Sequence, residues 1–283
     1  MPEIIRREEL GSRTVLLEIT DPEIAQKAKA GQFVVVVADE RGERIPLTLA
    51  DWDSKAGTVT IVFLVVGTST QKLAWLAPGD SIAHLSGPMG RPTEAEKFGT
   101  VAVVGGGVGL AAIFPIARAL KEAGNRVLTV MGARSRERLF WEDRLAKVSD
   151  ELIVTSDDGS CGRKGVVTQP LLELLQAGGV DRVIAVGPTV MMRFVAKATQ
   201  PFGVKTMVSL NPLMLDATGM CGVCRCKVDK QTKFACVDGP DFDAHAVDWD
   251  LLVSRQRGYC EEEAHSLERL VATKPGEEGH ARA

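Results

Sequence analysis

Residues 101–120, VAVVGGGVGLAAIFPIARAL, decide the fold of this 283-residue chain. A run of small and β-branched apolar residues leads into GGGVG, and apolar side chains then recur at helical spacing, at Leu110, Ile113 and Ala117. Gly124 follows as a helix stop signal. The stretch therefore predicts a buried strand, a glycine loop and a helix in direct succession.

The same alternation continues to residue 210. Strands are predicted at 127–134, 151–158, 182–188 and 205–210, and helices at 137–149, 167–179 and 189–200. Strands that alternate with helices indicate a parallel sheet with right-handed crossovers. Ligands of such sheets bind at the carboxyl ends of the strands, where the glycine loop, SDDGS at 156–160 and the pair Gly187 and Pro188 fall.

The first 97 residues have a different pattern. Short β-branched runs are separated by glycine, proline and charged turns, and no helix-length pattern occurs among them; the runs are 13–20, 32–39, 45–51, 57–66 and 80–88. Strands at this spacing predict a small antiparallel barrel or sandwich.

The expected fold class is therefore multidomain β plus α/β. It comprises an N-terminal antiparallel β-barrel at 1–97, a parallel-sheet α/β nucleotide-binding domain at 98–208 and a small C-terminal module at 209–262. A tail is expected at 263–283, frayed from about Lys274.

Composition excludes several kinds of partner. The net charge is −3 and no block of lysine or arginine occurs, so neither nucleic acid nor an anionic membrane surface is an expected partner. The longest uncharged stretch, 98–117, contains the glycine loop and Pro115, which fits a buried strand, loop and helix better than a membrane span. The N-terminus is charged and lacks the apolar core of an export signal, which predicts a cytoplasmic protein.

A second informative stretch, DATGMCGVCRCKVDKQTKFAC, runs from residue 216 to residue 236. Cys221, Cys224 and Cys236 form a C-x2-C-x11-C array, and Asp216 lies five residues before the first cysteine. A C-x2-C pair on a glycine-containing loop lets two thiolates converge on one metal centre, and a return segment supplies a further ligand, as in plant-type [2Fe–2S] sites. The array predicts a metal centre and favours an iron–sulfur cluster.

Two other uses of these cysteines fit less well. Structural zinc needs four Cys or His ligands, and the only nearby histidine, His245, stands outside any such pairing. A disulfide framework is disfavoured because four of the six cysteines are crowded together and no secretory signal is present. The spacing leaves the fourth ligand open. Cys226 points to the same side as Cys224 if a strand begins after the loop, whereas Asp216 is equally suited to a turn.

The glycine loop permits two interpretations. Glycines between a strand and a helix let the backbone approach a phosphate at the helix N-terminus. Leu110 occupies the last glycine position of the G-x-G-x-x-G dinucleotide fingerprint, so that motif is absent. Glycines at these positions also suit tight packing of the strand against the helix.

The order of the motifs is more specific than any one of them. The cysteine array is preceded by RIPLT at 44–48, VGTST at 66–70, GGGVG at 105–109, SDDGS at 156–160 and GPTVMM at 187–192. With this series the chain, up to about residue 262, resembles the ferredoxin–NADP reductase superfamily. Within it, the chain is most similar to the iron–sulfur electron-transfer subunits of dihydroorotate dehydrogenase B and of NADH-dependent ferredoxin:NADP oxidoreductase, the latter also called the sulfide dehydrogenase small subunit.

The resemblance implies an FAD-binding barrel at 1–97, an NAD(H)-binding domain at 98–208 and a [2Fe–2S] module at 209–262. An arginine and a hydroxyl residue, Arg44 and Thr48, are expected to hold FAD, while Pro46 and Leu47 replace the aromatic residue that usually stacks on the flavin. The turn at 66–70 would offer donors to the flavin diphosphate, although such turns are also ordinary hairpin chemistry. The expected cofactor-binding residues are Arg44, Pro46, Leu47, Thr48, Val66, Gly67, Thr68, Ser69, Thr70, Gly105, Gly106, Gly107, Val108, Gly109, Arg134, Asp158, Gly159, Gly187 and Pro188.

The resemblance also implies the ligands of the cluster. The dihydroorotate branch has C-x4-C-x2-C before its last cysteine, and in this chain an aspartate stands at the first of those positions. The other branch has a similar Asp/Cys3 shell, which here would comprise Asp216, Cys221, Cys224 and Cys236. Cys226 would then pack near the cluster as a bystander.

The implied activity is that of an NAD(H)-dependent FAD/[2Fe–2S] oxidoreductase subunit with no catalytic acid, base or nucleophile. Hydride exchange between nicotinamide and flavin is cofactor chemistry, and electrons then pass singly through the cluster. Arg134 and Arg136 would suit a 2′-phosphate, but the resemblance favours NAD(H).

The implied partner is a larger flavoprotein with FAD and [4Fe–4S] clusters. The resulting heterodimer would exchange electrons with NADP(H) and ferredoxin in flavin-based electron bifurcation. A subunit of dihydroorotate dehydrogenase or of a sulfide or polysulfide reductase is the alternative, and a zinc-stabilised nucleotide-binding subunit without catalysis is a third interpretation.

Overall fold

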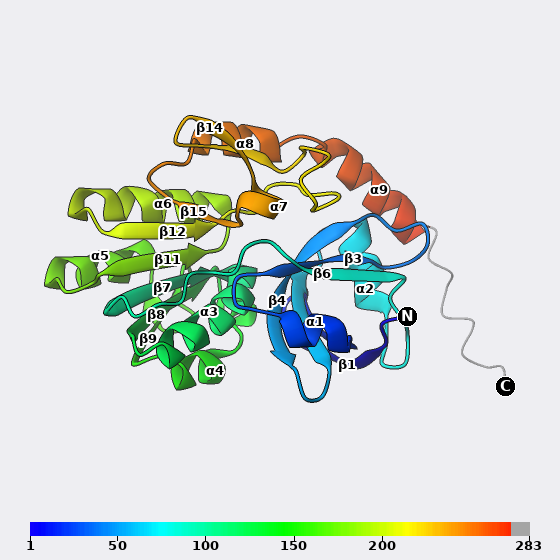
Figure 1. Cartoon of the computed structure of the whole chain (residues 1–283), viewed down its shortest axis with the longest axis horizontal. Coiled ribbons are helices and arrows are strands. Elements are labelled where there is room, and N and C mark those ends of the chain that lie inside the picture. The colour runs from blue at the N-terminus through cyan, green and yellow to red at the C-terminus, as the bar shows by residue number, and fades with distance from the viewer. Residues whose placement is uncertain (273–283) are drawn as a thin grey trace.

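The computed structural model describes residues 1–272. Figure 1 shows the N-terminal strands and the α/β layers side by side, with the cysteine-containing module lying across both. The expected division into an antiparallel β-domain, an α/β domain and a C-terminal module is confirmed.

The β-domain is one antiparallel sheet in the order β1-β2-β5-β4-β3-β6. Its strands are β1 (Ile4–Gly11), β2 (Thr14–Thr20), β3 (Phe33–Val37), β4 (Ile45–Asp53), β5 (Thr58–Leu64) and β6 (His84–Met89). The two ends of the sheet approach one another, because the Ile4 N–H donates to the Asp80 carbonyl at 2.9 Å and the Gly79 N–H donates to the Ile4 carbonyl at 2.8 Å. Branched apolar side chains fill the interior, among them Leu17, Ile61 and Phe63.

Three elements of this domain were absent from the sequence prediction. β1 has the sequence IIRREELG, whose charged residues conceal the strand. The short helices are α1 (Pro22–Lys27) and α2 (Thr68–Trp75). α1 begins where the Asp21 carboxylate accepts the Ile24 N–H at 2.9 Å, a side-chain N-cap followed by proline. Six and eight residues are too short to show a periodic pattern, so capping is the only local signal.

The α/β domain has the five parallel strands that the alternation predicted and a short sixth strand, β10, that it did not predict. They are β7 (Thr100–Gly106), β8 (Arg126–Ala133), β9 (Glu151–Ser156), β10 (Arg163–Lys164), β11 (Arg182–Val186) and β12 (Lys205–Ser209). The helices are α3 (Leu110–Glu122), α4 (Glu142–Lys147), α5 (Thr168–Ala177) and α6 (Thr189–Thr199). A short 3-10 turn, η1 (Gly107–Gly109), joins β7 to α3, and two further 3-10 turns are η2 (Arg136–Arg138) and η3 (Gln200–Phe202).

The C-terminal module is joined to the α/β sheet. Its elements are β13 (Arg225–Val228), β14 (Gln231–Phe234), α7 (Ala235–Asp238), β15 (Asp241–Asp243), α8 (Trp249–Gln256) and α9 (Cys260–Ala272). β15 pairs antiparallel with β12 and becomes the seventh strand, in the order β10-β9-β8-β7-β11-β12-β15. α9 extends into the segment 263–283 that was expected to be a tail, and the part from 273 onward, including Lys274, lies outside the described residues.

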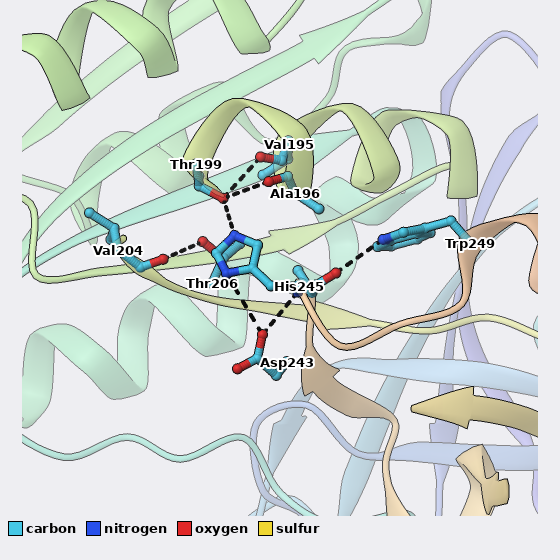
Figure 2. Close-up of polar contacts among 9 residues, drawn as sticks. Val195, Ala196, Thr199, Val204, Thr206, Asp243, His245 and Trp249 are labelled. Atoms are coloured by element: carbon cyan, nitrogen blue, oxygen red, sulfur yellow. Dashed lines mark hydrogen bonds and ion pairs between the residues drawn. The ribbon is translucent and has the colours of Figure 1, made fainter. Parts of the chain in front are cut away.

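A polar contact fastens the module to the end of α6 (Figure 2). His245 Nε2 lies 2.9 Å from the buried hydroxyl of Thr199, which also bonds the Val195 and Ala196 carbonyls. Nearby, Trp249 Nε1 donates to the Ala244 carbonyl at 3.0 Å. The turn after β15 is therefore held against α6 of the α/β domain.

A second contact joins the β-domain to the α/β domain. The Asp51 carboxylate on β4 accepts from Arg118 Nη1 of α3 at 2.8 Å and from Arg144 of α4. The Arg118 guanidinium lies over the Trp52 ring, and that of Arg144 lies 4.1 Å from the Phe114 ring centroid. The shared carboxylate and the Arg118–Trp52 contact join the two domains, whereas the Arg144–Phe114 contact lies within the α/β domain. Within residues 1–272, none of the helices is both long enough and apolar enough to cross a membrane.

Candidate cofactor cavity and metal centre

The three parts of the chain enclose one cavity of about 450 Å³ at their junction. Its volume lies within the roughly 300–1,000 Å³ of small-molecule sites. The lining comes from the start of β4, the turn before α2, the loop before α3, the turn before α6 and the segment after β12. Sequence-predicted members are Pro46, Leu47, Thr48, Val66, Thr70, Val108, Gly109, Gly187 and Pro188.

The glycine loop shows the tight packing that its sequence permitted, and the approach of a phosphate to it stays a prediction. A Cβ at Gly109 would overlap the carbonyl oxygen of Val186, so this glycine lets η1 pack against the end of β11. Gly107 has φ +55°, and a Cβ at this position would meet no atom within 4 Å, so its backbone faces open space. The predicted strand–loop–helix unit is thus close-packed at one glycine and open at another.

The turn at 66–70 is organised by its own threonine. Thr70 Oγ1 accepts the backbone N–H groups of Val66 and Gly67, each at 3.0 Å, and donates to the Gly67 carbonyl at 2.9 Å. The turn therefore satisfies its own donors while Val66 and Thr70 line the cavity. Thr68 and Ser69 instead face a smaller groove beside α9, where the Thr68 and Ser266 hydroxyl oxygens lie 2.9 Å apart.

Several predicted cofactor residues lie outside the cavity lining. Arg44 Nε donates to the Leu215 carbonyl at 3.2 Å, so this side chain connects β4 to the segment just before Asp216. Gly67 is the N-cap of α2, and Gly105 and Gly106 end β7. Their assignment to FAD or NAD(H) stays a prediction.

The residues expected near the far end of the dinucleotide form a separate polar group. Arg136 Nη1 bonds both Glu142 and the Cys161 sulfur at 3.0 Å. The Asp158 carboxylate accepts from the Ser160 hydroxyl at 2.6 Å, and this bond, followed by that from the Ser160 N–H, lowers the pKa of Asp158. Arg134 and Gly159 are exposed beside this turn. The group lies at the carboxyl ends of β8 and β9, where the strand order places ligands.

The cysteine array is partly assembled. Cys224 and Cys236 are buried and their sulfur atoms lie 3.2 Å apart. Burial first, and then the hydrogen bond with Cys224, raise the pKa of Cys236 to about 12, while the Gly219 N–H donates to its sulfur and lowers it. Cys221 is exposed at the loop that covers this pair.

Asp216 organises that loop. Its carboxylate accepts the Thr218 N–H at 2.9 Å and the Cys221 N–H at 2.7 Å. These bonds, led by that from Thr218, lower the pKa of Asp216, so the group is a carboxylate at neutral pH. Asp216 thus stabilises a turn, as its sequence position allowed. Its carboxylate oxygens can still bind a metal, because each retains a lone pair.

Cys226 has a different environment. It is buried on β13, its sulfur lies 3.6 Å from the Lys233 carbonyl, and burial raises its pKa to about 11. The donor set of thiols and one carboxylate suits an iron–sulfur cluster in chemical type. Among the described residues, no three Cys, His, Asp or Glu side chains converge closely enough to hold a single metal ion, so the full ligand shell stays a prediction.

Sequence reasoning missed much of the cavity wall. The missed lining residues are Gly31, Phe33, Val62, Phe63, Leu64, Ala112, Ile116, Val186, Ser209, Leu210, Asn211, Pro212, Met214 and Pro240. One signal was available for four of them, because 209–212 ends or follows a predicted parallel strand at its carboxyl end. Phe33 and Phe63 supply the aromatic side chains of the lining, whereas β4 contributes proline and leucine.

Comparisons with known proteins fit this geometry. Residues 211–248 match the family described as the iron–sulfur cluster binding domain of dihydroorotate dehydrogenase B. A homologue of the dihydroorotate dehydrogenase B (NAD(+)) electron transfer subunit from Thermotoga maritima is 47% identical over 271 residues, covering 96% of each chain. A probable electron transfer subunit of the same enzyme from Methanopyrus kandleri is 35% identical over 85% of this chain and 88% of its own.

Solved structures extend the similarity to the whole fold. A chain from the structure of NADH-dependent reduced ferredoxin–NADP oxidoreductase, reported with insights into flavin-based electron bifurcation, superimposes with a TM-score of 0.91 at 46% identity, covering 96% of this chain and 98% of its own. Phthalate dioxygenase reductase shares the fold at a TM-score of 0.59 and 17% identity, covering 87% of this chain and 97% of its own.

Proposed function

The chain belongs to the family of dihydroorotate dehydrogenase B electron-transfer subunits, and on that premise we propose that it transfers electrons between NAD(H), FAD and a [2Fe–2S] cluster and delivers them to a larger partner subunit. It is thus the NAD(H)-dependent subunit of a flavin and iron–sulfur oxidoreductase.

One observation supports this function above the others. The cavity is lined at once by the β4 segment, the turn before α2, the glycine loop, the turn before α6 and the segment that leads into the cysteine loop. A nucleotide-binding subunit without redox chemistry does not require the segment before the cysteine loop to line the same cavity. We propose that this lining connects a flavin site and a nicotinamide site to the segment that leads into the metal site.

The bound flavin and nicotinamide supply the hydride chemistry, so the chain needs no acid, base or nucleophile of its own. Its residues bind and orient the rings. Thr48, Ser209 and Asn211 are polar groups in an otherwise largely apolar wall, which is the usual composition of a site that orients a ring system. Asn211 is held rigidly, because its side chain accepts from Thr189 at 3.0 Å and its carbonyl accepts from Gln256 at 3.0 Å.

The metal centre is proposed to comprise Asp216, Cys221, Cys224 and Cys236. The Cys224–Cys236 pair and the loop bonds of Asp216 support it, and Cys226 is left as a packing residue whose thiol faces the Lys233 carbonyl. The surface around the loop is apolar, with Leu213, Leu215 and Met220 exposed by 44%, 43% and 86%. We propose that the larger subunit covers these side chains.

Our assignment of the partner subunit and of the overall reaction follows the solved structure that is 46% identical to this chain. We infer that the partner is a flavoprotein with FAD and [4Fe–4S] clusters, that the heterodimer exchanges electrons with NADP(H) and ferredoxin, and that it performs flavin-based electron bifurcation. All six cysteines are free thiols, which supports a cytoplasmic location.

The alternative is that the chain is the electron-transfer subunit of dihydroorotate dehydrogenase or of a sulfide or polysulfide reductase. The relatives at 47% and 35% identity support the first of these through their names. The aspartate at 216 distinguishes the chain from the all-cysteine dihydroorotate branch, which favours the bifurcating assignment.

The test is anaerobic purification followed by assays for FAD, iron, acid-labile sulfide and zinc on one sample. We expect one FAD and two irons per chain, with absorption that bleaches when NADH is added. Zinc without flavin would contradict the function. Copurification of a dihydroorotate dehydrogenase catalytic subunit, in place of an iron–sulfur flavoprotein, would select the alternative.

A further inference from the structure

Asp241 lies where the three parts of the chain meet. It begins β15, and its pairing partner on β12 is Ser209, a residue of the cavity lining. The preceding residue, Pro240, also lines the cavity, and its carbonyl accepts the Leu210 N–H at 2.9 Å. Asp241 is therefore flanked along its own strand and across the sheet by residues that form the cavity wall.

The β-domain reaches the same carboxyl through Thr93. Its hydroxyl donates to Asp241 Oδ2 at 2.5 Å, and its backbone N–H donates to the Ala30 carbonyl at 2.9 Å. A Cβ at Gly31, another lining residue, would overlap the Thr93 hydroxyl, so the two are in direct contact. The Asp241 carboxyl thus bonds Thr93, on the segment between the two domains, and lies on the strand that pairs with β12. Thr93 in turn contacts Gly31 of the cavity lining.

The second oxygen of this carboxyl has no partner. Asp241 Oδ1 is fully buried and makes no hydrogen bond, and it is the one such side-chain atom among the described residues. An unpaired buried carboxylate is costly, because its charge is neither solvated nor bonded. The neutral acid removes that cost and leaves an O–H without an acceptor.

Among residues 1–272, no cationic side chain is found to offset the charge of the Asp241 carboxylate. The charged group that acts on Asp241 is the Glu94 carboxylate, which repels a second negative charge and is itself paired with Arg182 at 3.0 Å. Arg91, on the same connecting segment, donates instead to the Val237 carbonyl at 3.1 Å. Thr93 and Ser209 are neutral. Burial, and to a lesser extent Glu94, raise the pKa of Asp241, while the hydrogen bond from Thr93 and the nearby Ser209 side chain oppose them.

We propose that the Asp241 carboxyl is a proton-binding site coupled to the redox state of the group held in the cavity. The carboxylate takes one proton from solvent when electrons enter the cavity, and the acid returns that proton to solvent when they leave. Electrons come from NADH and depart to the partner, so this inference rests on the proposed function. The coupling is electrostatic: a negative charge at Asp241, in a region of low dielectric constant, opposes the arrival of further negative charge.

A neutral isostere tests the coupling. In the purified protein with FAD, the flavin midpoint potential is measured by spectroelectrochemistry across pH for wild type, Asp241→Asn and Asp243→Asn. Asp243 is the matched control, since it lies two residues along the same strand with 47% of its side chain exposed. We expect Asp241→Asn to match wild type at low pH and to have the higher potential at high pH, where the wild-type carboxylate is charged. Equal potentials at every pH, or an equal effect of Asp243→Asn, would overturn the proposal.

A second variant keeps the proposal testable if Asp241→Asn does not fold. Thr93→Val removes a hydrogen bond that favours the carboxylate, so the pH at which the potential changes its slope because of Asp241 should move upward. The infrared carbonyl stretch of a buried protonated carboxyl should be present in the oxidised wild type at low pH and should persist to higher pH in Thr93→Val. This band needs no flavin, so its absence overturns the proton site alone, whereas a protein that binds no flavin overturns the proposed function as well.

Discussion

The sulfur atoms of Cys224 and Cys236 lie 3.2 Å apart although twelve positions separate them in the chain. The β13–β14 hairpin accounts for the approach, because the Ala235 N–H donates back to the Cys224 carbonyl at 3.2 Å. The buried Cys236 thiol resists ionisation in this position, and a bound metal cation would reverse that by displacing its proton.

Replacing one member of this pair should remove the cluster. We expect Cys236→Ser to lose most of its iron and acid-labile sulfide, since a buried thiolate ligand is replaced by a poorer donor. Cys226→Ser is the matched control: it is equally buried, but its sulfur faces the Lys233 carbonyl. Iron analysis and visible absorption are the measurements. Iron loss in Cys226→Ser with retention in Cys236→Ser would show that the ligand assignment is wrong.

The proposed role of Asp216 as a cluster ligand can be tested without removing the cluster. Asp216→Cys should retain iron and change both the midpoint potential and the EPR signal of the reduced cluster, because a thiolate is a softer and more covalent ligand than a carboxylate. Redox titration followed by EPR is the measurement. An unchanged potential and spectrum would mean that Asp216 only organises the loop through Thr218 and Cys221.

Two glycines of the loop before α3 should respond differently to alanine. Gly109→Ala places a methyl group against the Val186 carbonyl, so η1 must shift and FAD or NADH affinity should fall about 10-fold or more, roughly the effect of 1.4 kcal/mol. Gly107→Ala meets no atom and carries only the cost of a left-handed backbone, about 1–2 kcal/mol in stability. Fluorescence titration of the apoprotein with FAD, and kinetic titration with NADH, measure the affinities. Equal losses in both variants would argue against the packing explanation.

The contact between the domains predicts a change in stability. Asp51→Asn weakens two charge-assisted bonds, to Arg118 and Arg144, in a half-buried setting. After allowance for solvent screening, we expect a loss of about 1–2 kcal/mol in the free energy of unfolding. Asp53→Asn, at the exposed end of the same strand, is the control. Denaturant unfolding of the holoprotein is the measurement. A loss for Asp53→Asn as large as that for Asp51→Asn would contradict the assigned role.

Local sequence patterns predicted the architecture because they reflect local physics. Alternating apolar periods of two and 3.6 residues identify strands and helices wherever the element is long enough to show the period. They located the strands from β2 to β9, β11 and β12, and the helices from α3 to α6, and they failed at β1, β10, α1 and α2. In those elements charged residues or short length hide the pattern.

The candidate site was predictable only in part. The motif order indicated Pro46–Thr48, the turn at 66–70, the glycine loop and Gly187–Pro188, and most of these segments reach the cavity. Arg44 instead bonds the Leu215 carbonyl. Phe33 and Phe63 belong to ordinary strand patterns, and nothing local marks them as cavity residues.

The sequence by itself determined the three-part organisation, the family and the chemical types of the metal donors, because each is encoded in short segments whose order is visible along the chain. Tertiary structure alone decided that β15 completes the nucleotide-domain sheet, that Asp51 joins two domains and that the Asp241 carboxyl is buried behind the cavity. The physical reason is that burial, charge compensation and hydrogen-bond satisfaction depend on residues far apart in sequence. Thr93 and Asp241, for example, are 148 positions apart and share one hydrogen bond.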